Sequence, residues 1–252
     1  YQLFDLPRPK QKIVHIHPDP DEIGRVWQVD LAVVAQATAA AKAMAALPPV
    51  ANPRWSQWTK SARAEYLEES KPRATPGPVD MAAIVKHLSD TLPPDAIVTN
   101  GAGNYATWAH RYYTFRRYRT QLAPASGSMG YGLPAAVAAK LMHPDRPVVC
   151  FSGDGCLMMT VQELATAAQY GAAVVTVVFN NGMFGTIRMH QERHYPGRVS
   201  GTAIQNPDFA ALARAFGGHG ETVERTDQFP AAYRRAAASG KPAVIDLKVD
   251  PE

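Results

Sequence analysis

The sequence lacks most of the features that mark secreted, membrane-bound or disulfide-stabilised proteins. It has only two cysteines in 252 residues, Cys150 and Cys156, which fits a reduced cytosolic protein better than a disulfide scaffold. No apolar run approaches the roughly 20 residues that a helix needs to cross a bilayer, and we recognise no charged-then-apolar leader. We therefore expect a cytoplasmic protein that has no membrane partner.

Long runs of like charge are also missing. Lys and Arg number 26 and Asp and Glu 22, spread along the chain, for a net charge of +4 and a mild preference for anions. Residues 110–119, HRYYTFRRYR, mix basic and aromatic side chains as nucleic-acid surfaces do. On an α/β scaffold such a stretch is more often a solvated helix end or a subunit contact, so we expect no nucleic-acid partner.

The first part of the chain reads as an incomplete domain. Residues 12–17 indicate a strand and residues 31–47, rich in alanine, a helix; one strand and one helix cannot bury both their apolar faces. We expect residues 1–47 to be the C-terminal remnant of a central α/β domain, and the initial Tyr1, which is not Met, agrees with a longer gene product or a split enzyme. Residues 48–77 are a proline-rich linker with a short helix over 55–69.

Residues 78–252 alternate between helical and strand patterns. The strands are continuous apolar runs, which is typical of parallel sheets buried on both faces. We predict a doubly wound, mostly parallel α/β sheet of six strands with helices on both faces. The predicted strands lie within 95–104, 120–124, 147–155, 172–181, 219–223 and 242–249. Among the helices, we expect one to start near Thr160 and another to have Asn206 as its N-cap.

Four turns rich in Gly, Asn, Ser or Asp follow these strands or precede the helices. They span residues 100–105, 126–130, 153–156 and 180–185. In open α/β sheets ligands bind outside the carboxyl ends of the strands, and such turns bring N–H groups close to an anion. We expect the four turns to surround a ligand.

Two of these turns carry oxygen ligands. Asp154 lies between Gly153 and Gly155, and Asn181 follows the next strand; a carboxylate and an amide oxygen suit Mg²⁺ or Ca²⁺. The helix that follows Asp154 favours a phosphate at its N-terminal end. Either motif alone reads more simply as a helix cap or a chain reversal. Together, after two adjacent strands, they favour a metal–phosphate site.

The motifs resemble those of a known superfamily. GDG, 24 further residues and NN resemble the signature of thiamine-diphosphate-dependent enzymes. The segments SGSMGYGLPAA and NNGMFGTIRMHQE resemble the acetolactate synthase and 2-oxo acid decarboxylase group, and KIVHIHPDPDEIGRV resembles the end of its central domain. The resemblance covers about residues 75–250 as the diphosphate-binding domain, and implies a thiamine-diphosphate-binding fold.

The resemblance assigns roles to individual residues. Asp154, Asn181 and the Met183 carbonyl would bind Mg²⁺. Thiamine diphosphate would be contacted by Asn104, Gly127, Met129, Gly153, Asp154, Gly155, Cys156, Asn181, Met183 and Phe184. Within this set, Gly127 and Met129 would hold the aminopyrimidine, and Met129 would prop the cofactor in its bent conformation. From the residues alone, Met129 could instead be a gap-filling core side chain, and Cys156 either a reactive thiol or a small buried residue.

The implied activity is the decarboxylation of a small 2-oxo acid with carboligation, using thiamine diphosphate and Mg²⁺. Alternatives are a plain decarboxylase of the benzoylformate or oxalyl-CoA type, or a non-catalytic cofactor-binding subunit. The activating glutamate of the family lies on a pyrimidine-binding domain that no segment here resembles. We expect that domain to come from a missing N-terminal part or a partner subunit, the chain alone to be inactive, and a homodimer or homotetramer. FAD or a nucleotide in the incomplete central domain remains open.

One position departs from the family pattern. His190 stands where acetolactate synthases usually carry a tryptophan that shapes the pocket for the second 2-oxo acid, which places acetolactate synthase activity proper in question. His190 and His194 are acid/base candidates because histidine titrates near neutral pH. A polar pair at i,i+4 on a helix surface explains them equally well.

Overall fold

The computed structural model describes residues 3–251. They form two compact units, and the boundary in the sequence lies between Ala62 and Arg63. This boundary falls within the predicted linker, residues 48–77; the predicted limits at 47 and 77 stay predictions. In the described part of the chain, no helix is both long and apolar enough to cross a membrane.

The smaller unit is built on two parallel strands. β1 (Val14–His17) pairs with β2 (Leu31–Val34), a short 3-10 helix (Pro20–Glu22) lies between them in sequence, and α1 (Ala37–Ala45) follows. The predicted helix over 31–47 is therefore wrong in its first part. Leu31–Val34 includes two β-branched valines, which fit a strand better than a helix, and β1 offers a partner. None of the residues of α1 is buried.

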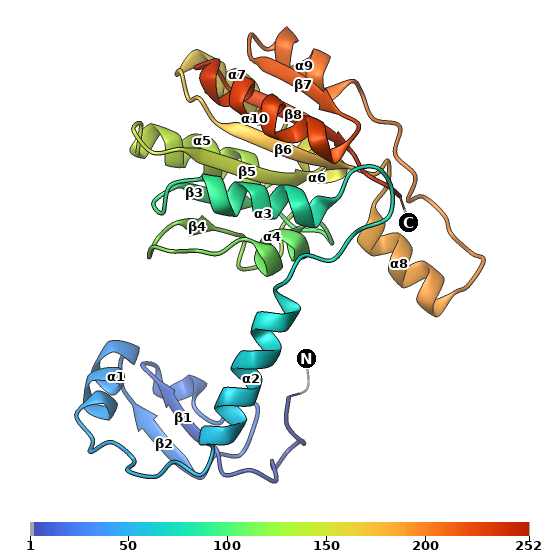
Figure 1. Cartoon of the computed structure of the whole chain (residues 1–252). Coiled ribbons are helices and arrows are strands. Elements are labelled where there is room, and N and C mark those ends of the chain that lie inside the picture. Colours follow the sequence, from blue (N-terminus) through green and yellow to red (C-terminus); the bar gives the residue numbers. More distant parts are fainter. Residues whose placement is uncertain (1–2, 252) are drawn as a thin grey trace. The chain divides into compact units, whose positions relative to one another are not determined.

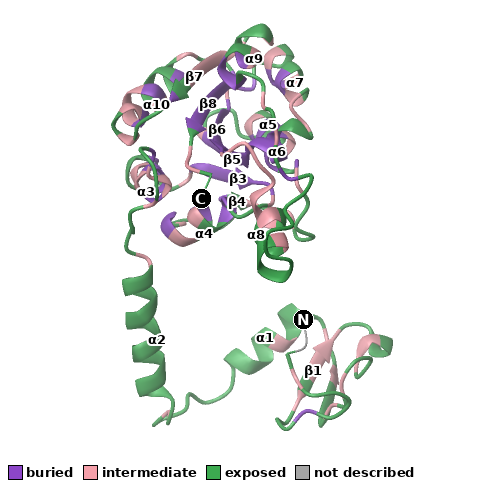
Figure 2. Ribbon diagram, turned by 90° about the vertical axis from the view of Figure 1, so that its right-hand side faces the viewer, coloured by how far each residue is buried: buried purple, intermediate pink, exposed green. Residues whose placement is uncertain are grey.

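The helix α2 (Ser56–Glu69) agrees with the helix predicted over 55–69 and crosses the boundary between the units. It has no buried residue, and Figure 2 shows it exposed along its length. Trp58 and Tyr66 are 74% and 56% exposed. Its helical conformation therefore draws little support from burial of its own side chains.

The larger unit contains the predicted parallel sheet. Its described strands are β3 (Ile97–Asn100), β4 (Gln121–Leu122), β5 (Val148–Gly153), β6 (Val175–Asn180), β7 (His219–Val223) and β8 (Ala243–Lys248). They lie in the order β4-β3-β5-β6-β8-β7, and every pair is parallel (Figure 1). The predicted six-stranded doubly wound α/β fold is confirmed.

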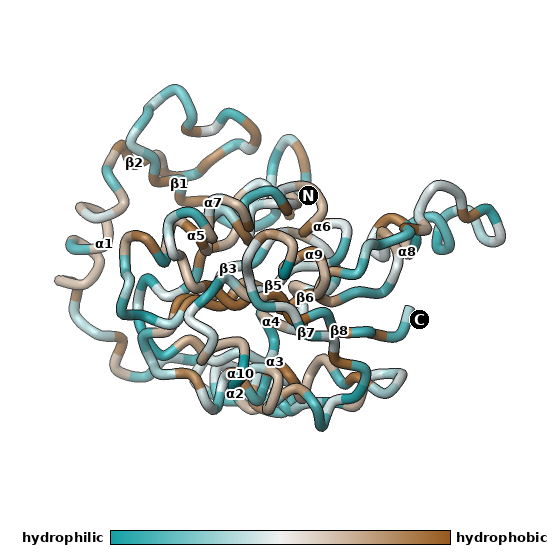
Figure 3. The backbone as a smooth tube through the Cα atoms, turned by 90° about the horizontal axis from the view of Figure 1, so that it is seen from above, coloured by the Kyte–Doolittle hydropathy of each residue, from teal (hydrophilic) through white to brown (hydrophobic). Residues whose placement is uncertain are grey.

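Helices cover both faces of this sheet. They are α3 (Met81–Thr91), α4 (Ala106–Tyr112), α5 (Gly132–Met142), α6 (Asp154–Met158), α7 (Glu163–Gln169), α9 (Phe209–Ala215) and α10 (Phe229–Ala238). A further helix, α8 (Gly185–His194), has no buried residue and belongs to neither core. One buried cluster joins α3, α4 and α10 to strand residues such as Val149 and Phe151. A second joins α5, α6, α7 and α9 to Val148 and Cys150. Because side chains alternate along a strand, β5 supplies both cores, and Figures 2 and 3 show its buried, apolar surroundings.

Two local details differ from the sequence reading, and both lie at the ligand-binding edge. The helix expected near Thr160 is present as α7, but a short helix that was not expected, α6, starts at Asp154 directly after β5. The N-cap of α9 is Asp208, whose Oδ1 accepts a hydrogen bond from the Ala211 N–H at 2.8 Å. Pro207 separates Asn206 from this cap, which leaves the Asn206 side chain free to bond elsewhere.

Candidate functional site

A cavity of about 850 Å³ lies at the carboxyl ends of the central strands. It is lined by turns that follow β3, β5 and β6, by Met129, by the first half of α8 and by the chain after β8. Of the residues predicted for the site, the cavity lining includes Asn104, Met129, Gly153, Asp154, Gly155, Cys156, Asn181, Met183 and Phe184. Nine of the ten residues that the sequence predicted for the cofactor site therefore lie on one surface, although they come from four separate turns.

Asp154 occupies the first position of α6, where β5 ends. Its side chain is buried, with the residue only 3% exposed. Oδ1 accepts a hydrogen bond from the Gly155 N–H at 2.8 Å, whereas Oδ2 accepts from the Gly182 N–H at 2.8 Å and from Asn206 Nδ2 at 2.7 Å. The carboxylate is therefore fixed by three neutral donors.

The charge of Asp154 is not balanced by a basic side chain. Within residues 3–251, no lysine or arginine forms an ion pair with it. A buried carboxylate is costly without a cation or a full set of donors. Asn181, with its amide oxygen, lines the same cavity. This donor set fits a hard divalent cation such as Mg²⁺.

The loop that carries Asn181 is held by an extended segment, residues 202–206. Phe184 N–H donates to the Thr202 carbonyl and Ile204 N–H donates to the Gly182 carbonyl, each at 2.8 Å. Asn181 Oδ1 accepts from the Met183 N–H at 3.2 Å. The loop is therefore fixed mainly by backbone hydrogen bonds, and Met183, the third predicted ligand, lies beside the other two.

The glycines of the GDG motif are required by close packing. A Cβ atom on Gly155 would lie 2.6 Å from Cε1 of Phe184, and one on Gly153 would lie 2.9 Å from Cδ1 of Tyr105. Real Cβ atoms do not approach other heavy atoms so closely. Two aromatic rings thus lie directly over the turn that holds Asp154.

Cys156 joins three of the predicted turns. Its Sγ accepts hydrogen bonds from the Tyr105 hydroxyl at 3.3 Å and from the Gly130 N–H at 3.1 Å, while the Gly101 N–H donates to the same hydroxyl at 3.0 Å. Burial raises the pKa of Tyr105 well above its usual range, so its hydroxyl stays protonated. These contacts favour the packing role of Cys156 over the reactive one.

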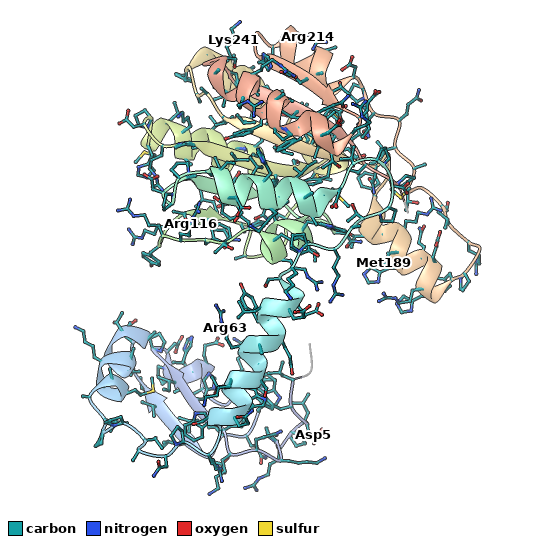
Figure 4. The ribbon with its side chains drawn as sticks, in the orientation of Figure 1. Asp5, Arg63, Arg116, Met189, Arg214 and Lys241 are labelled. Carbon is teal, nitrogen blue, oxygen red and sulfur yellow. The ribbon has the colours of Figure 1, made fainter. Side chains whose placement is uncertain are left out.

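The side chain of Asn104 contacts α8. Thr186 Oγ1 accepts from the Asn104 N–H at 3.0 Å and donates to Asn104 Oδ1 at 2.9 Å. Asn104 Nδ2 lies 3.8 Å from Sδ of Met189, which is labelled on α8 in Figure 4. Asn104 therefore connects the turn after β3 to the helix that walls the cavity, and its predicted contact with a diphosphate stays a prediction.

The other predicted residues differ in placement. Met129 is half-buried, packs against the core and lines the cavity, so both roles considered for it are compatible. Gly127 is exposed, adopts a φ of +69° and lies outside the described lining. His190 is also outside that lining; it is exposed, and its ring stacks on His194 with centroids 6.1 Å apart. This arrangement is that of a helix-surface pair.

Sequence reasoning missed several residues of this site. Asn206 was assigned to a helix cap, yet it bonds Asp154 and Asn180. Thr186, Arg188 and Glu192 of α8 line the cavity, and Arg188 pairs with Glu192 at 3.0 Å. The only sequence signal for Asn206 was the Asn-Pro pair itself, which marks a turn and does not reveal a partner 52 residues away.

Comparison with known proteins places this site in a family. Residues 101–247 match the family "Thiamine pyrophosphate enzyme, C-terminal TPP binding domain". The chain is 34% identical to the acetolactate synthase large subunit of Corynebacterium glutamicum, over 96% of this chain and 40% of that protein. It is also 34% identical to the acetolactate synthase isozyme 2 large subunit of Escherichia coli K12, over 96% of this chain and 44% of that protein.

A solved structure shows the same fold. The thiamine diphosphate-dependent 4-hydroxybenzoylformate decarboxylase of Rhodococcus jostii RHA1 matches with a TM-score of 0.76 and 26% identity, over 96% of this chain and 44% of that one. The chain thus spans less than half the length of these relatives. The resemblance read from the motifs is confirmed, and the chain belongs to the thiamine pyrophosphate enzymes through their C-terminal TPP binding domain.

Proposed function

We propose that the protein decarboxylates a small 2-oxo acid with thiamine diphosphate and Mg²⁺ and joins the product to a second carbonyl compound, as an acetolactate synthase-like enzyme. The observation that carries this proposal is the buried Asp154 carboxylate, which has no basic partner in the described residues and lies in one cavity with Asn181. The similarity to two acetolactate synthase large subunits supports the reaction class.

Different residues of the cavity would bind different parts of the cofactor. Asp154, Asn181 and the Met183 carbonyl would hold Mg²⁺, and Gly155, Cys156 and Asn104 would contact the diphosphate. Gly153 and Phe184 would shape the same surface, and Gly127 and Met129 would hold the aminopyrimidine. When bound, thiamine diphosphate supplies a carbanion nucleophile and an electron sink for the decarboxylation. Apolar lining such as Trp108 and Val249 would limit access of water.

The rest of the active site would come from other parts of the assembly. The activating glutamate would lie on a pyrimidine-binding domain, in the N-terminal part of a longer chain or in a partner subunit, within a homodimer or homotetramer. Residues 1–47 would complete a central domain, with FAD, a nucleotide or no ligand. On this proposal the chain by itself binds the cofactor weakly and is inactive.

A second candidate is a decarboxylase that does not join two carbonyl compounds. Its support is the similarity to a 4-hydroxybenzoylformate decarboxylase and the exposed His190 at the position where the tryptophan of acetolactate synthases is expected. Products formed by the full-length protein from pyruvate and from benzoylformate separate the two candidates. Acetolactate from pyruvate supports the first, and benzaldehyde from benzoylformate, with no coupled product, supports the second.

Cofactor binding itself is tested by calorimetry. Titration of the full-length protein with thiamine diphosphate should give a binding isotherm that depends on Mg²⁺. Asp154→Ala should abolish that dependence, because it removes the only charged ligand proposed for the metal, whereas Asp145→Ala, an exposed surface carboxylate, should not. Wild-type protein that binds no cofactor, or an Asp154→Ala variant with unchanged metal dependence, would contradict the proposal.

A further inference from the structure

A continuous line of hydrogen-bonded side chains runs from β8 to the candidate metal ligand. Lys248 Nζ donates to Asp246 Oδ2 at 2.6 Å, and Asn180 Nδ2 donates to Asp246 Oδ1 at 2.9 Å. Asn206 Nδ2 then donates both to Asn180 Oδ1 at 2.9 Å and to Asp154 Oδ2 at 2.7 Å. Asp246, Asn180 and Asp154 are 1%, 8% and 3% exposed, so the acceptors of these bonds are buried.

The chemistry of the line fixes the direction of both amides. A carboxylate only accepts hydrogen bonds, so Asn180 must turn its NH₂ group to Asp246 and its oxygen to Asn206. Asn206 then faces two acceptors and must present its own NH₂ group to both. Turning either amide round would bring its oxygen against another hydrogen-bond acceptor. The hydrogen bonds therefore decide which end of each amide is nitrogen and which is oxygen.

This orientation is maintained at a cost to the fold. Asn206 Oδ1 is buried and has no hydrogen-bond partner among the described residues. A buried polar atom without a partner is destabilising, and such atoms concentrate where a residue serves a site. Within residues 3–251, only the NH₂ group of the Asn206 side chain therefore takes part in hydrogen bonds; its oxygen does not.

The hydrogen bonds accepted by the two oxygens of Asp154 show what the NH₂ group of Asn206 does there. Each carboxylate oxygen has two acceptor directions. Oδ2 receives two N–H groups, from Gly182 and Asn206, whereas Oδ1 receives one, from Gly155. Oδ2 is therefore filled and Oδ1 retains one free direction.

We infer that Asn206 is a positioning residue: by occupying Oδ2 of Asp154 it leaves Oδ1 as the oxygen that binds the metal ion, and through Asn180 it ties this ligand to the loop of Asn181. The inference rests on the proposed function and extends it to a residue outside the ligand set. Partners that orient metal ligands in this way typically change metal affinity by 10-fold to 100-fold when removed.

The surrounding contacts make a clean variant available. Residues 202–206 are also held by the Phe184–Thr202 and Ile204–Gly182 backbone hydrogen bonds, which a side-chain substitution leaves intact. Asn206→Leu keeps the branching at Cγ and removes both donors. Asn206→Ser, which has a single donor, serves if the leucine variant does not fold. Gln205→Leu is the matched control, because Gln205 is the exposed neighbour on the same segment.

The experiment measures the dissociation constant for Mg²⁺ of the full-length protein at saturating thiamine diphosphate, together with the melting temperature of the metal-free protein. We expect Asn206→Leu to raise the Mg²⁺ constant about 10-fold or more, with cofactor binding restored at high Mg²⁺ because all ligands remain. The metal-free melting temperature of Asn206→Leu should fall below that of Gln205→Leu, because the substitution leaves the buried Asn180 Oδ1 without its donor. Unchanged Mg²⁺ affinity, or cofactor binding that high Mg²⁺ does not restore in the folded variant, would overturn the inference. Wild-type protein that binds no metal would overturn the proposed function as well, which is a separate result.

Discussion

The Tyr105 hydroxyl donates a hydrogen bond to Cys156 Sγ at 3.3 Å while it accepts one from the Gly101 N–H at 3.0 Å. Tyr105 follows β3 and Cys156 follows β5, so the hydroxyl fixes two turns that sequence reasoning assigned to one ligand. The ring of Tyr105 also lies against Gly153 and stacks on Phe179 with centroids 5.8 Å apart. One buried side chain therefore sets the spacing of both turns.

Tyr105→Phe should lower the free energy of unfolding by about 1–3 kcal/mol, because it leaves the buried Gly101 N–H without an acceptor. Urea denaturation followed by circular dichroism measures this change. Tyr118→Phe is the matched control, since that side chain is 89% exposed and its hydroxyl is hydrated. Equal stability of the two variants would show that the hydroxyl of Tyr105 does not stabilise the fold.

Gly155→Ala should destabilise the protein by about 1–3 kcal/mol, the range for overpacking of a close-packed site. The new methyl group would meet the ring of Phe184. The double variant Gly155→Ala, Phe184→Ala tests the cause, because removal of the ring should make the glycine substitution less harmful than in the wild-type background. Additive losses in unfolding free energy would place the strain elsewhere.

The fold of the larger unit could be predicted from the sequence because the strand, helix and turn patterns all indicate the same parallel sheet. Continuous apolar strands such as Val175–Asn180 predicted a buried parallel sheet, and glycine-rich turns marked the edge at which ligands bind. The predicted oxygen ligands lie together because the β5 and β6 strands that carry them are hydrogen-bonded neighbours. Family, fold and the place of the cavity followed from these patterns.

The errors have physical causes that local pattern does not contain. Leu31–Val34 belongs to a strand because β1 provides a parallel partner, which an alanine-rich context conceals. Asn206 bonds a residue 52 positions away, and Asp208, a residue type that caps helices as well as asparagine does, is the N-cap instead. Thr186 carries no signal in the sequence, and only the tertiary structure shows its two hydrogen bonds to Asn104.

Thr186→Val should loosen the contact between α8 and the turn after β3, because valine keeps the shape of threonine and lacks the hydroxyl. Loss of two exposed hydrogen bonds predicts a change of about 1 kcal/mol in local opening. Hydrogen exchange at the Asn104 amide, which donates to this hydroxyl, should become faster. Thr186→Ser should restore the protection, and Thr107→Val, an exposed control, should leave it unchanged. Slow exchange in the valine variant would contradict the predicted role of the hydroxyl.

The ion pair of Glu221 on β7 should make the protein less stable in acid than at neutral pH. Arg235 donates from Nε to Glu221 Oε1 at 2.8 Å and from Nη2 to Oε2, and His219 Nε2 lies 2.9 Å from Oε1. Hydrogen bonds from Arg235 hold the pKa of Glu221 below its ordinary value of 4.5, with His219 adding to the effect and burial opposing it.

Because the folded-state pKa is lowered, the carboxylate contributes its full stability above the unfolded-state value and loses it as the pH falls through the folded one. Glu221→Gln should therefore be less stable than the wild type at neutral pH, and the two should converge below pH 4.5. Urea denaturation at a series of pH values measures the difference, with the exposed Glu224→Gln as control. A difference that stays constant into acid would mean that the charge of Glu221 is not its cause, since glutamine carries none at any pH.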